Sequence, residues 1–225
     1  MEESDSLVFN QRFLERISSN LKGFVPLQDH REGFRRAAVA VVVTPASQRP
    51  GIRCLGMAPA EADQATLILT RRASKLKHHS GQWAFPGGRL DAGERPEEAA
   101  LRELWEEVGV EVEAGNVIGR LDDFTTRSGF IISPVVVWVG PGAEIIPNPD
   151  EVASVHRIPI AEFMRKDAPI LDTSSGERHP VLFMPVGDDW IAAPTAAIIY
   201  QFREVAVLGR ETRVAHFDQP YFAWQ

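Results

Sequence analysis

GRLDAGERPEEAALRELWEEVGV, residues 88–110, predicts a loop, a helix and a second loop. Pro96 suits the first turn of a helix, and the two glutamates after it favour the positive N-terminal end. Gly109 follows the last periodic residue and is typical of a helix stop. Apolar residues recur at three- and four-residue spacing, which predicts a buried stripe on this helix. They are Leu101, Leu104 and Val108.

The same helix carries three glutamates on one face, because Glu103, Glu106 and Glu107 stand at positions i, i+3 and i+4. Like charges at this spacing repel by roughly 0.2–0.5 kcal/mol per pair, and a bound cation would reverse the sign. Clustered carboxylates suit Mg²⁺ or Mn²⁺, which also bind substrate phosphates. The pattern therefore favours metal-assisted phosphoryl transfer. A solvated acidic face is the alternative interpretation.

The fixed positions of this stretch are Gly, five residues, Glu, seven residues, Arg-Glu, an aliphatic, any residue, Glu-Glu, any residue, Gly and an aliphatic. At every one of them the chain resembles the signature of the Nudix hydrolases. The resemblance implies an α/β fold, namely an α/β/α sandwich around a mixed β-sheet. It also implies hydrolysis of a diphosphate linked to another moiety, with Mg²⁺ or Mn²⁺ as the cofactor. The function must still be argued at the site.

The resemblance extends to the roles of individual residues. Two glutamates of the helix correspond to the principal metal ligands and one to a third, while a glycine corresponds to a ligand through its backbone carbonyl. These positions are Glu103 and Glu107, Glu106, and Gly88. Arg102 corresponds to a residue that orients a glutamate, here Glu94. We expect the five charged residues to form the catalytic set.

A second pattern precedes the helix: residues 68–73 (ILTRRA), then Lys77, Gly81 and residues 85–88 (FPGG). It resembles the additional motif of the coenzyme A pyrophosphatase branch of the Nudix family. Ile68 replaces a leucine of that motif, which is conservative. Lys77 stands where the branch has arginine, and the two cations differ in how they bind phosphate.

This upstream segment is basic, although the formal net charge of the chain is −7. Its cationic and titratable residues are Arg71, Arg72, Lys75, Lys77, His78 and His79. A solvated basic face is the alternative, but cations directly before an acidic helix suit a phosphorylated ligand beside a metal. We therefore predict substrate contacts from Arg71, Arg72, Lys77, His79, Gln82 and Gly87. A Gly-Gly pair is usually only a turn, and a single histidine is more often a surface or packing residue.

The composition is that of an ordinary globular protein with one substantial core, at 225 residues and 44% hydrophobic residues. The acidic balance argues against a protein that neutralises a nucleic-acid backbone. Cys54 is the only cysteine, which excludes an intramolecular disulfide and a cysteine-rich zinc site. The acidic N-terminus lacks the features of a secretory signal, and no apolar run is long enough to span a membrane. We expect a cytoplasmic protein with no nucleic-acid or membrane partner.

Periodicity and turn residues predict strands that alternate with helices, as in an α/β sandwich. The expected strands are 37–43, 65–70, 83–85, 110–112, 117–121, 124–126, 131–139, 152–158, 184–186 and 190–191. The expected helices are 13–21, 96–108, 160–165 and 194–207, with a long loop at 45–63. Residues 1–33 are predicted to be a helical extension outside the core. Residues 34–225 are predicted to be one Nudix domain with a C-terminal helix and an aromatic tail.

Two segments outside these motifs leave alternatives open. Glu151 lies in a polar turn before a strand, and some Nudix enzymes draw a further glutamate, as base or metal ligand, from such a loop; a solvated turn is the competing interpretation. The tail at 216–224 is rich in aromatic side chains, which would form an apolar patch if exposed. We expect it to dock on the domain or on a second subunit, so a homodimer is possible. Base stacking against a nucleotide is the remaining role.

If the resemblance to the coenzyme A branch holds, the substrate is coenzyme A or an acyl derivative. Cleavage of its diphosphate gives phosphopantetheine, or the acylated form, and adenosine 3′,5′-bisphosphate. The nearest alternative is a Nudix hydrolase that acts on ADP-ribose, a dinucleotide cofactor or a nucleoside triphosphate. A non-catalytic Nudix domain that senses a nucleotide is a third hypothesis, but no glutamate of the signature is lost.

Overall fold

The computed structural model describes residues 7–46, 63–73, 81–173 and 179–220. The helices are α1 (Gln11–Gly23), α2 (Pro96–Val108) and α3 (Thr195–Gln201), with short turns η2 (Ala114–Asn116), η3 (Ile160–Met164) and the π-helical η4 (Phe202–Val207). The strands are β1 (Arg35–Pro45), β2 (Ala65–Arg72), β3 (Trp83–Ala84), β4 (Gly87–Arg89), β5 (Val117–Arg120), β6 (Phe124–Thr125), β7 (Phe130–Trp138), β8 (Val152–Pro159), β9 (Ile170–Asp172), β10 (Val181–Val186) and β11 (Asp189–Ala192).

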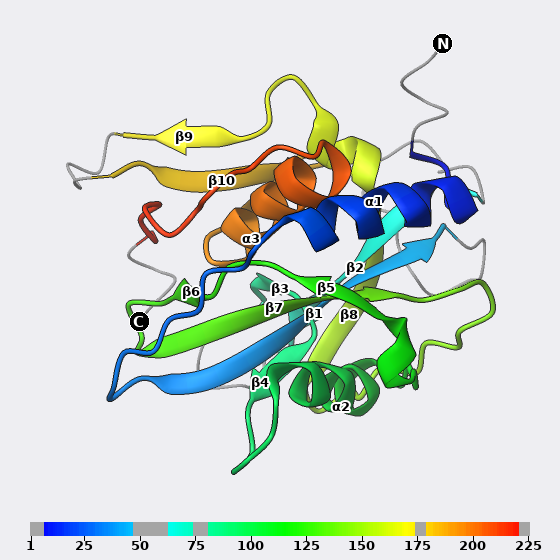
Figure 1. The fold of residues 1–225 in the computed structure, drawn as a ribbon, viewed down its shortest axis with the longest axis horizontal. Helices are drawn as coiled ribbons and strands as arrows, with labels where there is room; N and C mark the ends of the chain where they lie inside the picture. The colour runs from blue at the N-terminus through cyan, green and yellow to red at the C-terminus, as the bar shows by residue number, and fades with distance from the viewer. Residues whose placement is uncertain (1–6, 47–62, 74–80, 174–178, 221–225) are drawn as a thin grey trace.

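The main sheet is mixed, with β1 at its centre (Figure 1). β1 pairs in parallel with β7, from Arg35 opposite Phe130 to Val43 opposite Trp138, and the other pairings are antiparallel. On its other side β1 pairs first with β4 and then, through its last residues, with β2. β3 and β4 therefore lie between β2 and the first half of β1. A separate three-stranded sheet has the order β11-β10-β9.

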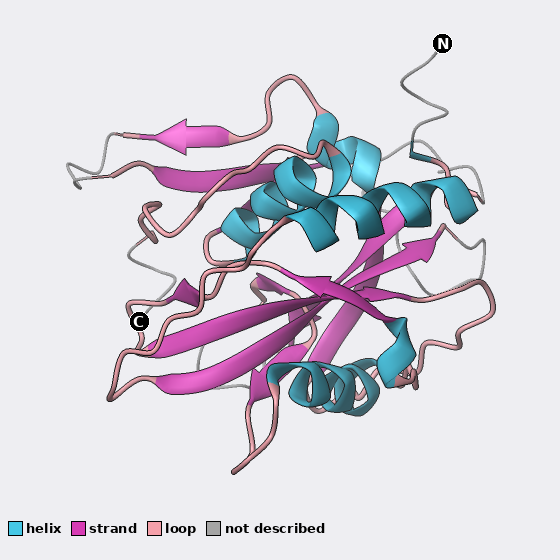
Figure 2. Ribbon diagram, in the orientation of Figure 1, coloured by secondary structure: helices cyan, strands magenta, loops and turns pink. Residues whose placement is uncertain are grey.

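Helices cover both faces of the main sheet, with α2 on one face and α1 and α3 on the other (Figures 1 and 2). The alternation of β1 explains this arrangement, because successive side chains of a strand point to opposite faces. Ala38, Ala40 and Val42 pack in the cluster that contains the buried face of α2. Val41 and Val43 pack in the cluster that contains α1 and α3. The predicted α/β/α sandwich around a mixed sheet is confirmed.

The expectation that residues 1–33 lie outside the core is wrong for α1. Asn10 caps the helix, since its side chain accepts a hydrogen bond from the Phe13 amide. Phe13, Ile17 and Leu21 are buried in the same cluster as α3 and the main sheet. The sequence correctly indicated an amphipathic helix here, but periodicity does not reveal which surface the apolar stripe meets.

Other differences concern short apolar segments. Residues 110–112 are not a strand, because Val110 instead packs against the buried face of α2. β9 was not expected, since its pattern is mostly exposed. The predicted closing helix is α3 continued by the π-helical η4. Most of the expected loop at 45–63 lies outside the described residues. Among the helices that are described, none combines the length and apolar character needed to cross a bilayer.

Candidate active site

The acidic helix α2 lies against β4, and glycine makes this close approach possible. Arg95 precedes the first turn, Pro96 occupies it, and Gly109 ends the helix in the left-handed conformation with φ 73°. A Cβ on Gly88 would clash with the carboxyl group of Glu103. A Cβ on Gly87 would clash with the Ala38 carbonyl oxygen of β1. The two glycines of the FPGG segment therefore allow Glu103 and Glu107 of α2 to pack directly against the backbone of β4.

Glu107 is the most deeply placed of the helix glutamates. Its side chain is only 5% exposed, and its Oε2 accepts a hydrogen bond of 3.2 Å from the Gly87 amide. Burial raises the pKa of Glu107 to about 7, against the opposing effects of that hydrogen bond and of the Arg72 charge. Burial also raises the pKa of Glu103, although Arg102 opposes the shift. Buried carboxylates with raised pKa values are typical of functional sites.

Arg102 holds the acidic residues in a network. Its guanidinium binds Glu94 through two hydrogen bonds, 2.9 Å from Nε to Oε1 and 3.0 Å from Nη2 to Oε2. Nη1 donates to Glu103 at 2.9 Å and to Glu106 at 3.2 Å. Nη2 also donates to the Arg89 carbonyl at 3.0 Å, so Arg102 ties α2 to the end of β4. Glu94 is the bidentate partner of the arginine, the geometry in which such pairs are strongest.

The donor set of α2 fits a hard divalent cation, since it consists of carboxylate oxygens and lies beside the Gly87–Gly88 backbone. Within the described residues, however, no three acidic, histidine or cysteine side chains already form a metal cluster. Glu106 is bound to Arg102 and its side chain is 43% exposed, whereas Glu107 is buried. Convergence of the three glutamates on a cation therefore requires Glu106 to turn away from Arg102.

Glu151 joins this acidic group from a distant part of the chain. It lies in the turn before β8, where Asn148 donates to its Oε1 at 3.3 Å. Its charge raises the pKa of both Glu103 and Glu107. Its backbone carbonyl accepts from the Ala73 amide, which fixes the turn beside the end of β2. The structure thus brings Glu151 near the α2 glutamates, which favours the expectation of a further functional glutamate over the competing one of a solvated turn.

A cavity of about 800 Å³ opens on the opposite face of the sheet from α2. Its floor includes Ala37, Val39 and Ile132, and Ile198 of α3 contributes to the facing wall. Gly87 and Gly88 also line it, and these are the residues that contact Glu107 and Glu103 on the other side. The cavity and the acidic cluster therefore meet across β4.

Both predicted arginines of β2 line this cavity, although neighbouring residues of a strand normally face opposite ways. The register with β8 shifts between Arg71 and Arg72, and this irregularity explains the exception. Arg71 forms an ion pair with Asp189 and stacks on Trp83 at 4.0 Å. Among the residues that the structure describes, no carboxylate forms an ion pair with Arg72, and its Nε is buried without a hydrogen-bond partner. An unpaired guanidinium nitrogen beside Glu107 is suited to a phosphate oxygen.

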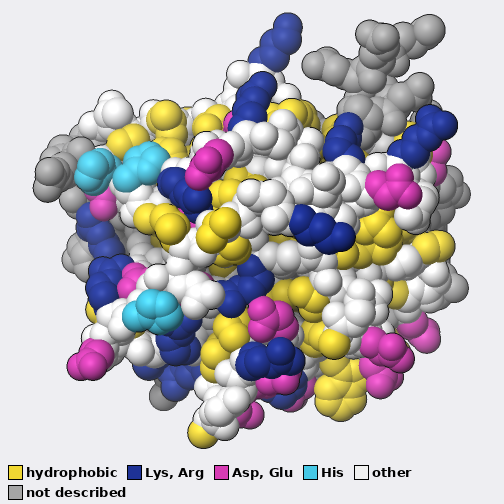
Figure 3. Space-filling model, viewed as in Figure 1, with side chains coloured by type: hydrophobic (Ala, Val, Ile, Leu, Met, Phe, Trp, Pro, Cys, Tyr) yellow, Lys and Arg dark blue, Asp and Glu magenta, His cyan; other side chains and the backbone are white. Residues whose placement is uncertain are grey.

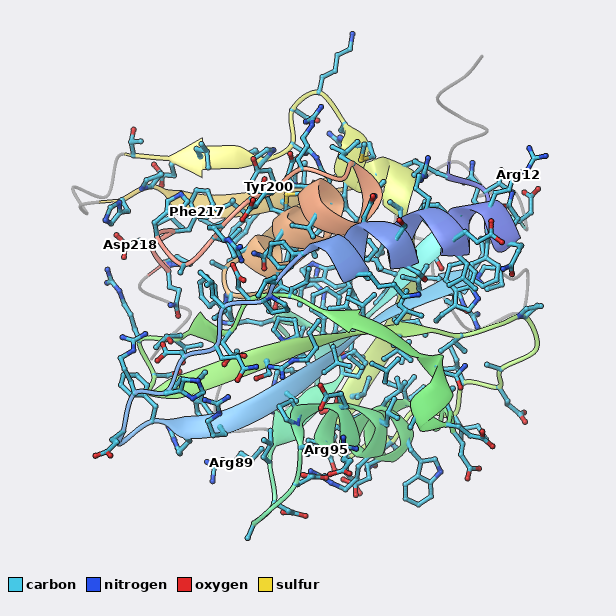
Figure 4. All side chains as sticks on the ribbon, in the orientation of Figure 1. Arg12, Arg89, Arg95, Tyr200, Phe217 and Asp218 are labelled. Carbon is cyan, nitrogen blue, oxygen red and sulfur yellow. The ribbon has the colours of Figure 1, made fainter. Side chains whose placement is uncertain are left out.

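The remaining predicted contacts have different outcomes. Gln82 lines the cavity and its carbonyl accepts from the Arg72 amide. Lys77 and His79 lie outside the described residues. Of the tail, Phe217 packs on Tyr200 of α3 with ring centroids 6.1 Å apart (Figure 4). Gln219 is one of the residues that line the cavity. The described part of the tail therefore docks on the domain.

Several cavity residues were not predicted, because no local pattern marks them. They are Arg35, Trp83, Arg89, Thr126, Ser128, Phe130, Asp189, Trp190 and Thr195. They come from seven separate elements or loops, and the pairing and packing of distant segments brings them together. The sequence pattern predicted most of the strands that carry these residues. Only the order of the strands in the sheet shows that the residues line one cavity.

Comparison with known proteins gives one family. A model described as the NUDIX domain matches residues 35–175. The chain is 37% identical over 142 residues to the uncharacterized Nudix hydrolase NudL of Photorhabdus laumondii subsp. laumondii, covering 62% of this chain and 76% of that one. It is 38% identical over 139 residues to the protein of the same name from Pectobacterium atrosepticum, covering 60% and 72%.

Among solved structures, a MutT/nudix family protein from Enterococcus faecalis resembles the chain with a TM-score of 0.51. The likeness covers 91% of this chain and 74% of that one, at 19% sequence identity. At this level of identity the likeness supports the fold alone. The matched residues 35–175 contain α2, β4 and the turn that carries Glu151.

Proposed function

Because the chain belongs to the Nudix hydrolase family and is a Nudix pyrophosphohydrolase, we propose that its substrate is coenzyme A or an acyl-coenzyme A. The observation that carries this proposal is the position of Arg72. This residue of the ILTRRA block lines the cavity, has a buried unpaired Nε and lies close enough to Glu107 to lower its pKa. The block that resembles the coenzyme A branch is thus built into the junction between the cavity and the acidic helix.

In the proposed reaction the diphosphate lies over Gly87 and Gly88, between Arg72 and the glutamates of α2. Glu103, Glu106 and Glu107 would hold Mg²⁺ or Mn²⁺, with the Gly88 carbonyl as a further ligand. A cation bound there would supply charge neutralisation and a more acidic water. Arg102 positions Glu103 and, through its bidentate pair, is itself fixed by Glu94.

Arg72 donates to phosphate oxygens from the cavity side and stabilises the charge that develops on the leaving phosphate. A glutamate accepts the proton of the attacking water, and the candidates are Glu103, Glu106, Glu107 and Glu151. Removal of the general base lowers the rate typically 10²–10⁴-fold. Metal titration of Glu→Gln variants distinguishes a base from a metal ligand. The substitution leaves metal affinity intact at the base and weakens it at a ligand.

The test is product identification by mass spectrometry after incubation with Mg²⁺ or Mn²⁺. The substrate panel contains coenzyme A, acyl-coenzyme A, ADP-ribose, NADH and nucleoside triphosphates. We expect metal-dependent release of adenosine 3′,5′-bisphosphate from coenzyme A, and no release by the Glu107→Gln variant. Cleavage of another panel member in preference to coenzyme A would replace the proposed substrate and keep the chemistry. Absence of any turnover would favour a nucleotide-sensing domain.

Two further features of the proposal rest on the sequence. We propose a cytoplasmic location, because a single cysteine fits a reducing compartment. A homodimer remains a proposal for the aromatic tail, and size-exclusion chromatography with light scattering measures it directly.

A further inference from the structure

The cavity has two ends that differ in charge balance. It extends across the sheet from β2 and β3, through β4, to the beginnings of β1 and β7. The glycines next to the acidic cluster lie in the middle, on β4. A substrate whose diphosphate lies at β4 therefore extends one half toward each end. The charges at the two ends indicate which half goes where.

Two arginines line the β2 and β3 end of the cavity: Arg72, which we assign to the diphosphate, and Arg71, which is already neutralised. Arg71 pairs with Asp189 of β11, and the same carboxylate accepts a hydrogen bond of 3.1 Å from Trp83 Nε1. Trp190, next in the chain, is 48% exposed and lines the cavity. Beyond Arg72, this end offers aromatic surface and a satisfied ion pair, so the part of the cavity near Asp189 and Trp190 suits an uncharged group.

The other end holds two guanidinium groups around one aromatic ring. Arg35 lies 3.9 Å from the ring centroid of Phe130 and Arg89 lies 5.5 Å from it. Arg35 donates to the Ser128 carbonyl at 2.8 Å. Within the described parts of the chain, no carboxylate forms an ion pair with either guanidinium.

In this respect Arg35 and Arg89 resemble Arg72 and differ from many of the described arginines. Many of the other described arginines form ion pairs, among them Arg36, Arg102, Arg120, Arg127, Arg165 and Arg213. Lys and Arg side chains gather on the left of Figure 3, where β1 and β7 begin in Figure 1. Two neighbouring cations repel each other, and an anion between them removes this cost. Arginine on an aromatic ring is also preorganised for phosphate recognition.

We propose that Arg35 and Arg89, held around Phe130, bind a second phosphate of the substrate, the 3′-phosphate of the adenosine half of coenzyme A. This inference rests on the proposed function. The adenosine half then lies toward β7, and the uncharged pantetheine half lies toward Asp189 and Trp190. Arg35 and Arg89 thus determine specificity for a phosphorylated ribose, and the metal-binding glutamates lie outside this site.

The test compares coenzyme A with dephospho-coenzyme A, which lacks only the 3′-phosphate. The measured quantity is the ratio of the two kcat/KM values for the wild type, Arg35→Gln and Arg89→Gln. Arg12→Gln is the matched control, because Arg12 is an exposed arginine of α1 on the far side of the molecule from Arg89 (Figure 4). We expect each cavity variant to lower the preference for coenzyme A about tenfold, and Arg12→Gln to keep it. Thermal unfolding verifies that the variants fold.

Equal losses on both substrates would overturn the proposal, since the arginines would then serve the diphosphate. If the wild type cleaves neither compound, the proposed function fails, and the phosphate site is tested separately by calorimetry. The probes are adenosine 3′,5′-bisphosphate and adenosine 5′-monophosphate. Tighter binding of the bisphosphate, lost in Arg35→Gln and Arg89→Gln, would support the site. Equal affinity for the two probes would refute it.

Discussion

Glu107 is the most deeply buried of the three α2 glutamates that we propose as metal ligands. It is buried beside Gly87, and its pKa is raised by burial and by the nearby charges of Glu103 and Glu151. We expect Glu107→Gln to lower kcat at least a hundredfold with Mg²⁺ while circular dichroism stays unchanged, because an amide keeps the shape but not the charge. A matched change, Glu113→Gln, alters an exposed glutamate after α2 and should leave kcat unchanged. Near-wild-type turnover of Glu107→Gln with full metal binding would refute the assignment.

The same burial predicts how stability depends on pH without metal. The folded-state pKa of Glu107 is about 7, above that of an exposed glutamate, so folding favours the protonated form. The free energy of unfolding should therefore fall as pH rises from about 4.5 to 7, by up to about 3 kcal/mol. Denaturation in EDTA measures this slope. Glu107→Gln should flatten it, and Mg²⁺ should restore stability most at the upper end of the range.

The two glycines of β4 have different roles in the element, and alanine separates them. Gly87→Ala places a Cβ against the backbone of β1, which cannot move aside, so we expect a loss of about 1–3 kcal/mol in the free energy of unfolding. Gly88→Ala meets the end of the Glu103 side chain, which can rotate. The expected result there is near-normal stability with weaker Mg²⁺ binding. Urea denaturation and metal titration distinguish the two, and the reverse pattern would contradict this assignment.

Elements with strong local patterns were predictable, and their partners were not. The periodicity, Pro96 and Gly109 located α2, and its glutamates were assigned from the sequence. The sequence did not reveal which side chains of β1 face which helix layer, because a strand that is buried on both sides reads as a continuous apolar run. Arg35, Phe130 and Asp189 enter the cavity only through strand order and the packing of the second sheet. Local spacing carries no information on such distant pairings.

At the scale of the whole molecule, α1 is part of the core and not a detachable extension. Ile17 is fully buried between α1 and the remainder of the main cluster. We expect Ile17→Ala to lower the free energy of unfolding by about 2–5 kcal/mol, whereas Ser19→Ala on the exposed face of α1 should change it by under about 0.5 kcal/mol. Chemical denaturation measures both. Equal, small effects would show that α1 contributes little to folding.

The placement of the acidic helix and the cavity on opposite faces of one sheet has an evolutionary consequence. Within the described residues, the cavity and the glutamates of α2 adjoin at β4, where Gly87 and Gly88 contact both. The side chains of β1 and β7 that line the cavity lie on the other face of the sheet from the α2 cluster. Under the proposed assignment of the two sites, mutations in the cavity can therefore change what the enzyme recognises while leaving the α2 glutamates in place. Descendants of such a chain are free to diversify in substrate while inheriting one unchanged hydrolytic apparatus.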